Sequence, residues 1–351
     1  MQNHASDLQT FLASKKMEER AMLEEKYIQS ILIDSNNLKC LNLKCSISDN
    51  IMHISEINSF GSISTDVSAS FVVPNKEKDK QAQILSRTSM ANKSIENLQV
   101  TKIRQFKVPC ISGITGNTFC PNGDMVFVDY TPENRLLIID SMGNFRRDIS
   151  LPSIQPYDVT SIDDNTVAVT TWCQKDIYVV DIDLGIIKAQ ISGDFFGGLT
   201  RRGNTLICCD RSNELKAVDL LLDNTVSTLI TGVPIDQQSY VATSTNKIFV
   251  TNCMYNTVSC YNINGEKEWQ FDGKSMVKTP FGVTVDRFNN VYVSSNGDAS
   301  VVLITPDGKQ ARIVLENKDG IVSPYCVHFN QTQNKLLVTN IRGDAFLYNI
   351  S

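Results

Sequence analysis

The chain has 351 residues, of which 42% are hydrophobic and 20% charged, and its net charge is −5. This is the composition of an ordinary folded protein with room for two or three domains. The absence of a basic excess argues against general nucleic-acid binding, which depends on Lys and Arg. No stretch approaches the ~20 apolar residues of a membrane span, and the polar N-terminus is unlike a secretory signal. We therefore expect a cytoplasmic protein without membrane contact.

The cysteines and histidines do not form a metal-binding pattern. The chain has 10 cysteines without a C-x-x-C pair, and its 3 histidines are not clustered with them. A zinc finger, RING or B-box module is therefore not encoded in this sequence. Several cysteines lie inside apolar strand patterns, where a free thiol packs well in a reducing compartment. We expect neither a metal nor another cofactor.

A run of helix-forming residues lies near the N-terminus. Neither Gly nor Pro occurs from Asp7 to Asp34, and Asp7 can cap a helix. The apolar residues recur at helical spacing, although Lys15 and Glu18 break a strict heptad. We predict a helix over residues 1–35 that forms the end of a coiled coil and mediates self-association. A solvated helix packed on its own domain is the alternative.

Two segments of different composition follow this helix. Residues 36–73 are rich in Ser, Ile and Val and contain short alternations, which predicts a small strand-containing or irregular segment. Residues 74–97 are charged, rich in Ser and poor in aromatic residues. Such a composition is typical of a flexible polar linker.

Six copies of one pattern fill the rest of the chain. The clearest is PFGVTVDRFNNVYVSSNGDASVVLITPDG, residues 280–308, in which short apolar alternations are separated by polar turns. A period near forty with four short strands per copy predicts an all-β fold, the six-bladed β-propeller. The residues that close the second alternation of each copy lie 41, 38, 43, 43 and 44 residues apart, and they are Val128, Val169, Ile207, Val250, Val293 and Leu337.

The last copy lacks its fourth strand. The chain reaches Ser351 after three strands of this copy, whereas LQVTKIRQFKV, residues 98–108, has strand character and no blade of its own. An unpaired sheet edge is a template for aggregation. We therefore predict that residues 98–108 pair with the AFLYNI strand and close the ring, so that the propeller domain covers residues 98–351.

This order of parts resembles the C-terminal portion of tripartite-motif (TRIM) proteins that carry an NHL-repeat propeller. The parts are a coiled-coil end, a short region with SFGSIST, a polar linker and six blades of the PFGVTVDRFNNVYVSSNGDASVVLITPDG form. The resemblance implies that the propeller recruits protein or RNA targets, and that relatives with RING and B-box modules act as E3 ubiquitin-protein ligases. Because those zinc modules are missing here, we carry over the recruitment and not the catalysis.

We therefore predict a non-catalytic interaction and scaffold protein, in which the propeller recruits a target. One alternative is the substrate-recognition part of a TRIM-type E3 ubiquitin ligase whose RING lies outside this chain. A second alternative is an RNA-binding propeller, which the charge balance does not favour.

The candidate binding residues lie in the turns between the second and third strands. These turns gather at one mouth of a propeller channel, and loops on a rigid scaffold are where binding chemistry sits. Trp, Tyr and Arg dominate binding hot spots. We predict that a protein target binds through Arg135, Trp172, Arg211, Tyr255 and Arg342, with packing between blades as the alternative for the two aromatic residues.

An aromatic residue recurs where the first strand of five copies begins. One residue type at one repeat position indicates packing between blades rather than a ligand cage. The residues are Tyr157, Phe196, Tyr240, Phe281 and Tyr325, with Gly116 at this place in the first copy.

A metal-dependent propeller enzyme would need several carboxylates or histidines converging in the channel. Asp129, Asp210 and Asp298 lie at or near the relevant turns. Isolated aspartates at strand ends usually accept hydrogen bonds from the backbone two residues on, so we interpret them as turn caps. We interpret His328, in the last copy's first strand, as a packed histidine.

Overall fold

The computed structural model describes residues 39–46, 62–69, 95–111, 113–130, 132–273 and 275–351. They belong to two units, which divide between residues 84 and 85. In the first unit, β1 (Lys39–Ser46) and β2 (Ser62–Ala69) pair antiparallel. The helix predicted over residues 1–35 and nearly all of the linker predicted over residues 74–97 lie outside the described residues.

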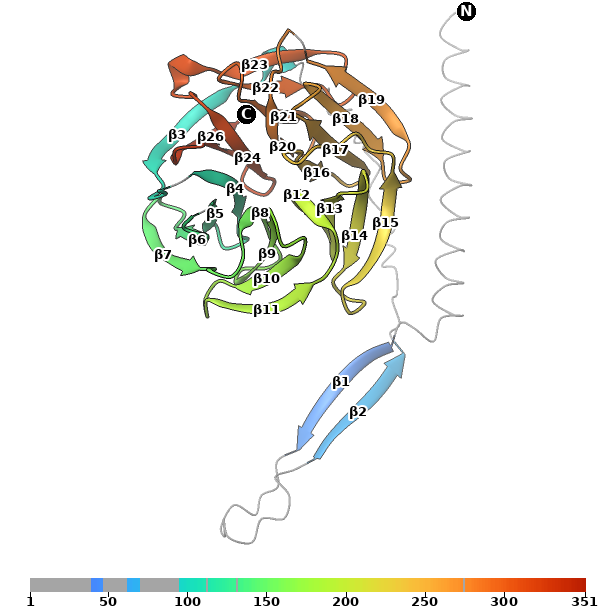
Figure 1. Ribbon diagram of the computed structural model, residues 1–351. Coiled ribbons are helices and arrows are strands. Elements are labelled where there is room, and N and C mark those ends of the chain that lie inside the picture. Colours follow the sequence, from blue (N-terminus) through green and yellow to red (C-terminus); the bar gives the residue numbers. More distant parts are fainter. Residues whose placement is uncertain (1–38, 47–61, 70–94, 112, 131, 274) are drawn as a thin grey trace, which may run out of the picture. The chain divides into compact units, whose positions relative to one another are not determined.

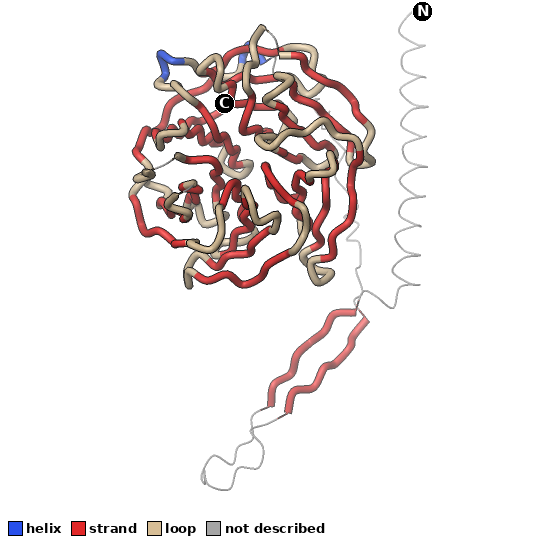
Figure 2. Tube along the Cα trace, in the orientation of Figure 1, coloured by secondary structure: helices blue, strands red, loops and turns tan. Residues whose placement is uncertain are grey.

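The second unit is the predicted six-bladed β-propeller (Figures 1 and 2). Each blade is a four-stranded antiparallel sheet whose first strand stands nearest the axis and whose fourth lies on the perimeter. No helix in the described part of the chain is long and apolar enough to cross a membrane.

Blade one is β4 (Ile114–Phe119), β5 (Met125–Asp129), β6 (Arg135–Ile139) and β7 (Phe145–Ser150). Blade two is β8 (Pro156–Ser161), β9 (Thr166–Thr171), β10 (Ile177–Asp181) and β11 (Ile186–Ile191). Blade three is β12 (Phe195–Arg202), β13 (Thr205–Asp210), β14 (Glu214–Asp219) and β15 (Thr225–Thr231). Blades four and five are β16 (Val241–Thr243), β17 (Lys247–Asn252), β18 (Thr257–Asn262) and β19 (Lys267–Asp272); and β20 (Pro280–Val285), β21 (Val291–Ser295), β22 (Ser300–Ile304) and β23 (Ala311–Leu315). Blade six is β24 (Pro324–Asn330), β25 (Lys335–Asn340), β26 (Asp344–Ile350) and β3 (Val100–Lys107). Two short helices lie outside the blades: η2 (Ile95–Asn97) precedes β3 along the chain, and η3 (Asn317–Asp319) precedes β24.

Blade six is completed from the other end of the propeller sequence. β3 pairs antiparallel with β26, from Asp344↔Lys107 to Ile350↔Val100. The pairing continues beyond the strands, because the Gln99 and Ser351 backbones exchange hydrogen bonds of 2.9 and 3.1 Å. The ring is therefore closed by the pairing that the missing fourth strand predicted.

Apolar alternation explains which strands lie inside. The central strands, such as β5 and β9, are buried along their whole length, whereas the outer strand β7 exposes most of its residues. The buried side chains pack between neighbouring blades, as Val126 and Val128 of blade one do with Val167 and Val169 of blade two. Burial of apolar surface of this kind is the main driving force of folding.

Candidate functional site

The propeller has two ends, which differ in the turns that form them. Because the strands are antiparallel, turns between the second and third strands lie at one end, which we call the 2–3 face. Turns between the first and second strands lie at the other end, which we call the 1–2 face. All five predicted binding residues lie in or beside 2–3 turns: Arg135 at the start of β6, Trp172 after β9, Arg211 after β13, Tyr255 before β18 and Arg342 before β26.

Arg135 is engaged inside blade one. Its guanidinium group forms ion pairs with Asp129 at 3.0 Å and Asp148 at 2.9 Å. It also donates a hydrogen bond of 3.1 Å to the Pro109 carbonyl oxygen. These bonds join the second, third and fourth strands to the segment before β4, so the side chain has a structural role.

Trp172 is half-buried and packs toward the axis. Its ring lies 5.1 Å from the Tyr157 ring and 6.2 Å from the Tyr130 ring, centroid to centroid. Its backbone carbonyl accepts a 3.2 Å hydrogen bond from Arg211. Arg211 and Arg342 are both exposed, unlike Arg135 and Trp172.

The turn between β17 and β18 exposes two large apolar side chains. Met254 is 74% exposed and Tyr255 67% exposed. The backbone beneath them is fixed, because the Met254 amide donates to Asp236 at 3.1 Å and the Tyr255 amide donates to Asn252 at 2.9 Å. Asn256 follows with a φ of 56°, which Asn tolerates better than most residues. The turn is thus held rigidly while both side chains face solvent.

Three tyrosines close the channel just below the 2–3 face, and we call them the tyrosine plug: Tyr157, Tyr240 and Tyr325. The ring centroids of Tyr157 and Tyr240 lie 5.7 Å apart, and those of Tyr240 and Tyr325 lie 6.2 Å apart. The hydroxyls of Tyr157 and Tyr325 are 3.2 Å apart, and the Tyr240 hydroxyl donates to the Thr115 carbonyl. Burial raises the pKa of Tyr325 to about 12, so its hydroxyl is neutral and can donate a hydrogen bond.

The recurring aromatic residues therefore do not all share one role. Phe196 packs between blades three and four, as predicted, and Phe281 stacks on Tyr325 with centroids 4.2 Å apart. The three plug tyrosines instead meet across the channel. They come from alternate blades, a pattern that the expectation of blade-to-blade packing did not include.

Glycines in the intervening blades make room for this arrangement. A Cβ atom on Gly116 would lie 2.8 Å from the Asp158 Cα atom, and one on Gly198 would lie 2.4 Å from the Tyr240 Cα atom. A Cβ atom on Gly282 would lie 2.8 Å from the Tyr325 carbonyl oxygen. The inner strands of blades one, three and five thus approach the next blade so closely that a side chain does not fit.

The three aspartates considered for a metal site do not converge. Asp129 is paired with Arg135, Asp298 forms a 2.9 Å ion pair with Lys278, and Asp210 accepts a 3.0 Å hydrogen bond from the Ser212 amide. The turn-cap interpretation is therefore correct for Asp210, whereas the other two form ion pairs. Within the described ranges, no three His, Cys, Asp or Glu side chains are grouped to hold a metal ion.

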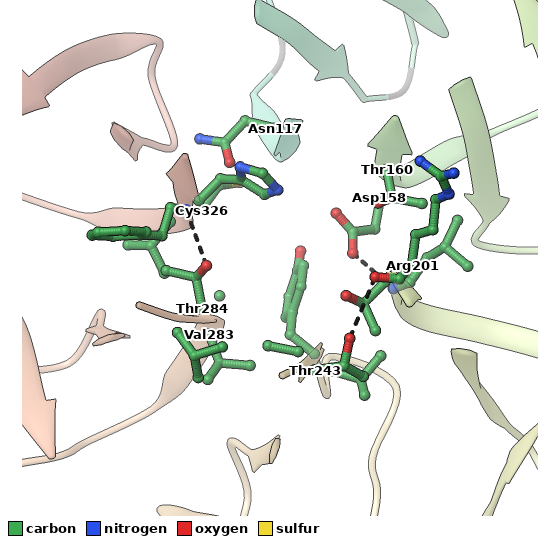
Figure 3. A pocket seen from close by; sticks show the side chains of 18 of the residues that line it. Asn117, Asp158, Thr160, Arg201, Thr243, Val283, Thr284 and Cys326 are labelled. Atoms are coloured by element: carbon green, nitrogen blue, oxygen red, sulfur yellow. Dashed lines mark hydrogen bonds between the residues drawn. The ribbon is translucent and has the colours of Figure 1, made fainter. Parts of the chain in front are cut away.

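A cavity of about 330 Å³ lies in the channel on the side of the 1–2 face (Figure 3). The later halves of the inner strands line it, and Tyr240 of the tyrosine plug belongs to its wall. Its polar lining residues include Asn117, Asp158, Thr160, Arg201, Thr243 and His328. Burial lowers the pKa of His328 to about 4, so the imidazole is neutral, and its ring lies 5.8 Å from the Phe119 ring.

Sequence reasoning missed this cavity, although the repeats hold a signal for it. Aligning the inner strands on Gly198 and Gly282 places Asp158 where those glycines stand. The same alignment places Asn117 and Arg201 where blade five has valines. Polar residues at positions that other copies fill with apolar ones mark a channel wall, and only the copy-by-copy comparison shows them.

No family model matches the chain, and no curated protein matches it. Membership of the TRIM family is therefore not supported by these comparisons. Solved structures do match the propeller. A protein of unknown function from Bacteroides thetaiotaomicron VPI-5482 is 13% identical, with a TM-score of 0.59 over 72% of this chain and 76% of that one.

Two further solved structures are similar at the level of the fold. Virginiamycin B lyase from Staphylococcus aureus is 14% identical, with a TM-score of 0.51 over 72% of this chain and 89% of the lyase. Regucalcin from Agrobacterium tumefaciens str. C58, described as a calcium-binding protein, is 16% identical, with a TM-score of 0.52 over 69% and 91% of the two chains. Such identities show a shared fold, and since one of these proteins is an enzyme, the fold does not exclude catalysis.

Proposed function

We propose that this protein is a non-catalytic recruiting and scaffold protein that binds a protein partner through the 2–3 face of its propeller. The observation that carries the proposal is the rigid turn that exposes Met254 and Tyr255. Large side chains on a fixed backbone bind with little further loss of conformational freedom, which favours them as binding hot spots.

The rest of the 2–3 face supports a protein rather than a small molecule as the partner. The three buried side chains of the tyrosine plug fill the channel beneath it, which favours a partner that binds across the surface. Ile111 and Val322, in connections that lead into first strands, add exposed apolar side chains, and Arg211 and Arg342 add charge. Apolar groups bordered by polar ones are typical of protein interaction sites.

The test compares two matched pairs of exposed side chains. One variant carries Met254→Ala with Tyr255→Ala, and the control carries Leu221→Ala with Leu222→Ala. The control residues are 73% and 64% exposed in the turn between β14 and β15, at the 1–2 face. Partners are first identified by quantitative affinity capture with the full chain, and the Kd of each purified partner is then measured by calorimetry.

We expect the first variant to weaken binding at least tenfold, which corresponds to roughly 1.4 kcal/mol, and the control to bind within about twofold of the wild type. Loss of binding in the control alone would place the interface on the 1–2 face and contradict the proposal. Capture of RNA whose retention falls steeply with added salt would favour the RNA-binding alternative.

Two finer parts of the proposal rest on the sequence. The first is self-association through the helix predicted over residues 1–35, which would raise the avidity of paired propellers. Native mass measurement tests it, because the full chain should be oligomeric and a chain beginning at Ile95 monomeric. The second is a role as the substrate-recognition part of a TRIM-type ubiquitin ligase. It requires that a captured partner become ubiquitinated when this chain and a RING-bearing relative are both present.

A further inference from the structure

The channel cavity has the form of a small-ligand site. The tyrosine plug closes its inner end, and the inner strands of all six blades form its wall, with Figure 3 showing Asn117, Asp158 and Arg201 around the same open space. Its volume of about 330 Å³ falls at the lower end of the range of small-molecule pockets. A ligand would enter from the 1–2 face, away from the surface proposed to bind a protein.

Three buried polar atoms on this wall have no hydrogen-bond partner: Asn117 Oδ1, Arg201 Nε and His328 Nδ1. Asn117 is only 4% exposed, and its amide nitrogen is already committed to Thr339 Oγ1 at 2.8 Å. Buried polar atoms are nearly always hydrogen-bonded, because leaving one unpaired costs about 1–3 kcal/mol. All three atoms belong to residues that line the cavity, so its wall is polar and incompletely hydrogen-bonded.

The cavity also holds one acidic and one basic group that do not neutralise each other. Asp158 is 6% exposed, and its two oxygens accept hydrogen bonds from the amides of Val159 at 2.9 Å and Leu199 at 2.8 Å. Neither Asp158 nor Arg201 belongs to an ion pair found among the described residues. Burial raises the pKa of Asp158 to about 7, so a nearby cation would stabilise the ionised form.

The two groups are arranged along the channel. Leu199 holds Asp158 and lies two residues before Arg201 on β12, so the basic residue stands roughly 7 Å nearer the 1–2 face, at about 3.3 Å per strand residue. The inner part of the cavity thus requires a donor or cation, and the outer part an acceptor or anion.

We propose that the channel cavity binds a small zwitterion of the size of a free amino acid, with its ammonium group toward Asp158 and Asn117 Oδ1 and its carboxylate toward Arg201. This goes beyond the proposed recruiting function, because it uses the opposite face and a different class of ligand.

The test measures binding of the twenty free L-amino acids to the full chain by saturation-transfer NMR and calorimetry. Acetate and ethylammonium serve as half-ligands that each carry one of the two charges, and glycerol serves as a neutral polar probe. We expect at least one amino acid to bind with a Kd below about 1 mM, and both half-ligands and glycerol to bind at least tenfold more weakly, since each loses a charged contact.

Variants assign this binding to the cavity. Arg201→Ala should weaken the amino acid at least tenfold, while Arg201→Lys should recover part of the affinity because it keeps the charge. Arg202→Ala is the matched control, because Arg202 is the next residue of the same strand but does not line the cavity. The Arg201 Nε atom has no hydrogen-bond partner in the fold, so loss of the side chain should leave the circular dichroism unchanged.

Failure of all twenty amino acids to bind at 10 mM would overturn the proposal, as would tighter binding of glycerol or acetate, or an Arg201→Ala variant with wild-type affinity. None of these outcomes depends on the protein partner. The Met254→Ala, Tyr255→Ala variant should bind the amino acid normally, so that failure of this proposal and failure of the recruiting function are distinguishable.

Discussion

Asp158 is a buried carboxyl group, and its titration should be visible in the stability of the protein. Burial raises its pKa to about 7 from an ordinary value of 3.8, so the folded state keeps a proton that the unfolded chain has already released. Its contribution to stability is therefore complete below about pH 4 and is lost as the pH rises through 7. We expect the free energy of unfolding of the wild type, relative to Asp158→Asn, to fall by about 1 kcal/mol per pH unit over this range.

Urea denaturation of both proteins at several pH values between 4 and 7 gives this difference. Arg201 and His328 also line the cavity, but both remain in the two proteins, so their contributions largely cancel. The Asn variant loses one acceptor for a backbone amide, which shifts its stability by an amount nearly independent of pH. Parallel stability curves for the two proteins would show that Asp158 is ionised in the fold.

For single residues, the sequence predicted the face of the propeller on which each lies better than it predicted their contacts and exposure. Residue type and repeat position placed Arg135, Trp172 and Tyr255 at one face, because turn position follows from the blade pattern. The same information did not reveal that Arg135 is bound by Asp148, since that contact depends on how the third and fourth strands pair. Exposure, which distinguishes Tyr255 from Trp172, is likewise a property of neighbouring blades.

Among the elements, the inner strands are constrained most tightly. A Cβ atom at Gly198 would lie 2.4 Å from the Tyr240 Cα atom and 2.6 Å from the Val241 nitrogen. Because these are backbone atoms, β12 and β16 would have to separate. We expect Gly198→Ala to destabilise the fold by about 1–3 kcal/mol, which is typical of overpacking, as measured by the urea midpoint at constant m-value.

Gly113→Ala is the control for this substitution. Its Cβ atom would first meet the end of the Ile341 side chain at 3.1 Å, which can rotate away, so we expect a loss below about 1 kcal/mol. Equal losses in the two variants would mean that the close approach of the inner strands does not limit stability.

The elements themselves were largely predictable, because short alternating strands and polar turns leave a clear periodic signal. The exact register of the strands was not predictable, as the residues that close the second alternation of each copy show. The cross-strand partner of Val159 is Val169, and that of Val283 is Val293, but Val128 pairs with Gly116 rather than with a residue after it. Each of these first strands contains an irregularity in register, and a bulge of this kind is not readable from hydrophobic alternation alone.

At the scale of the whole molecule, ring closure was predictable and channel chemistry was not. The missing fourth strand and the spare segment before the first blade could be matched from the sequence, because a blade of only three strands would leave its third strand as an unpaired edge. The channel cavity instead depends on which side chains of six separate strands meet at the axis. Asn117 and Asp158 belong to neighbouring blades, and nothing in either repeat by itself shows that both border one space.

Ring closure through β3 should control the stability of the entire propeller. A chain beginning at Val108 lacks the partner of β26 as well as Ile95 and Leu98, which pack with Ile350 in one core cluster. We expect its Tm to lie roughly 10 °C or more below that of a chain beginning at Ile95, since several kcal/mol are removed and each shifts Tm by about 2–4 °C. A synthetic peptide of residues 95–107 should restore Tm by strand addition, whereas a scrambled peptide should not. Equal melting temperatures for the two chains would mean that the remaining blades hold the ring without this strand.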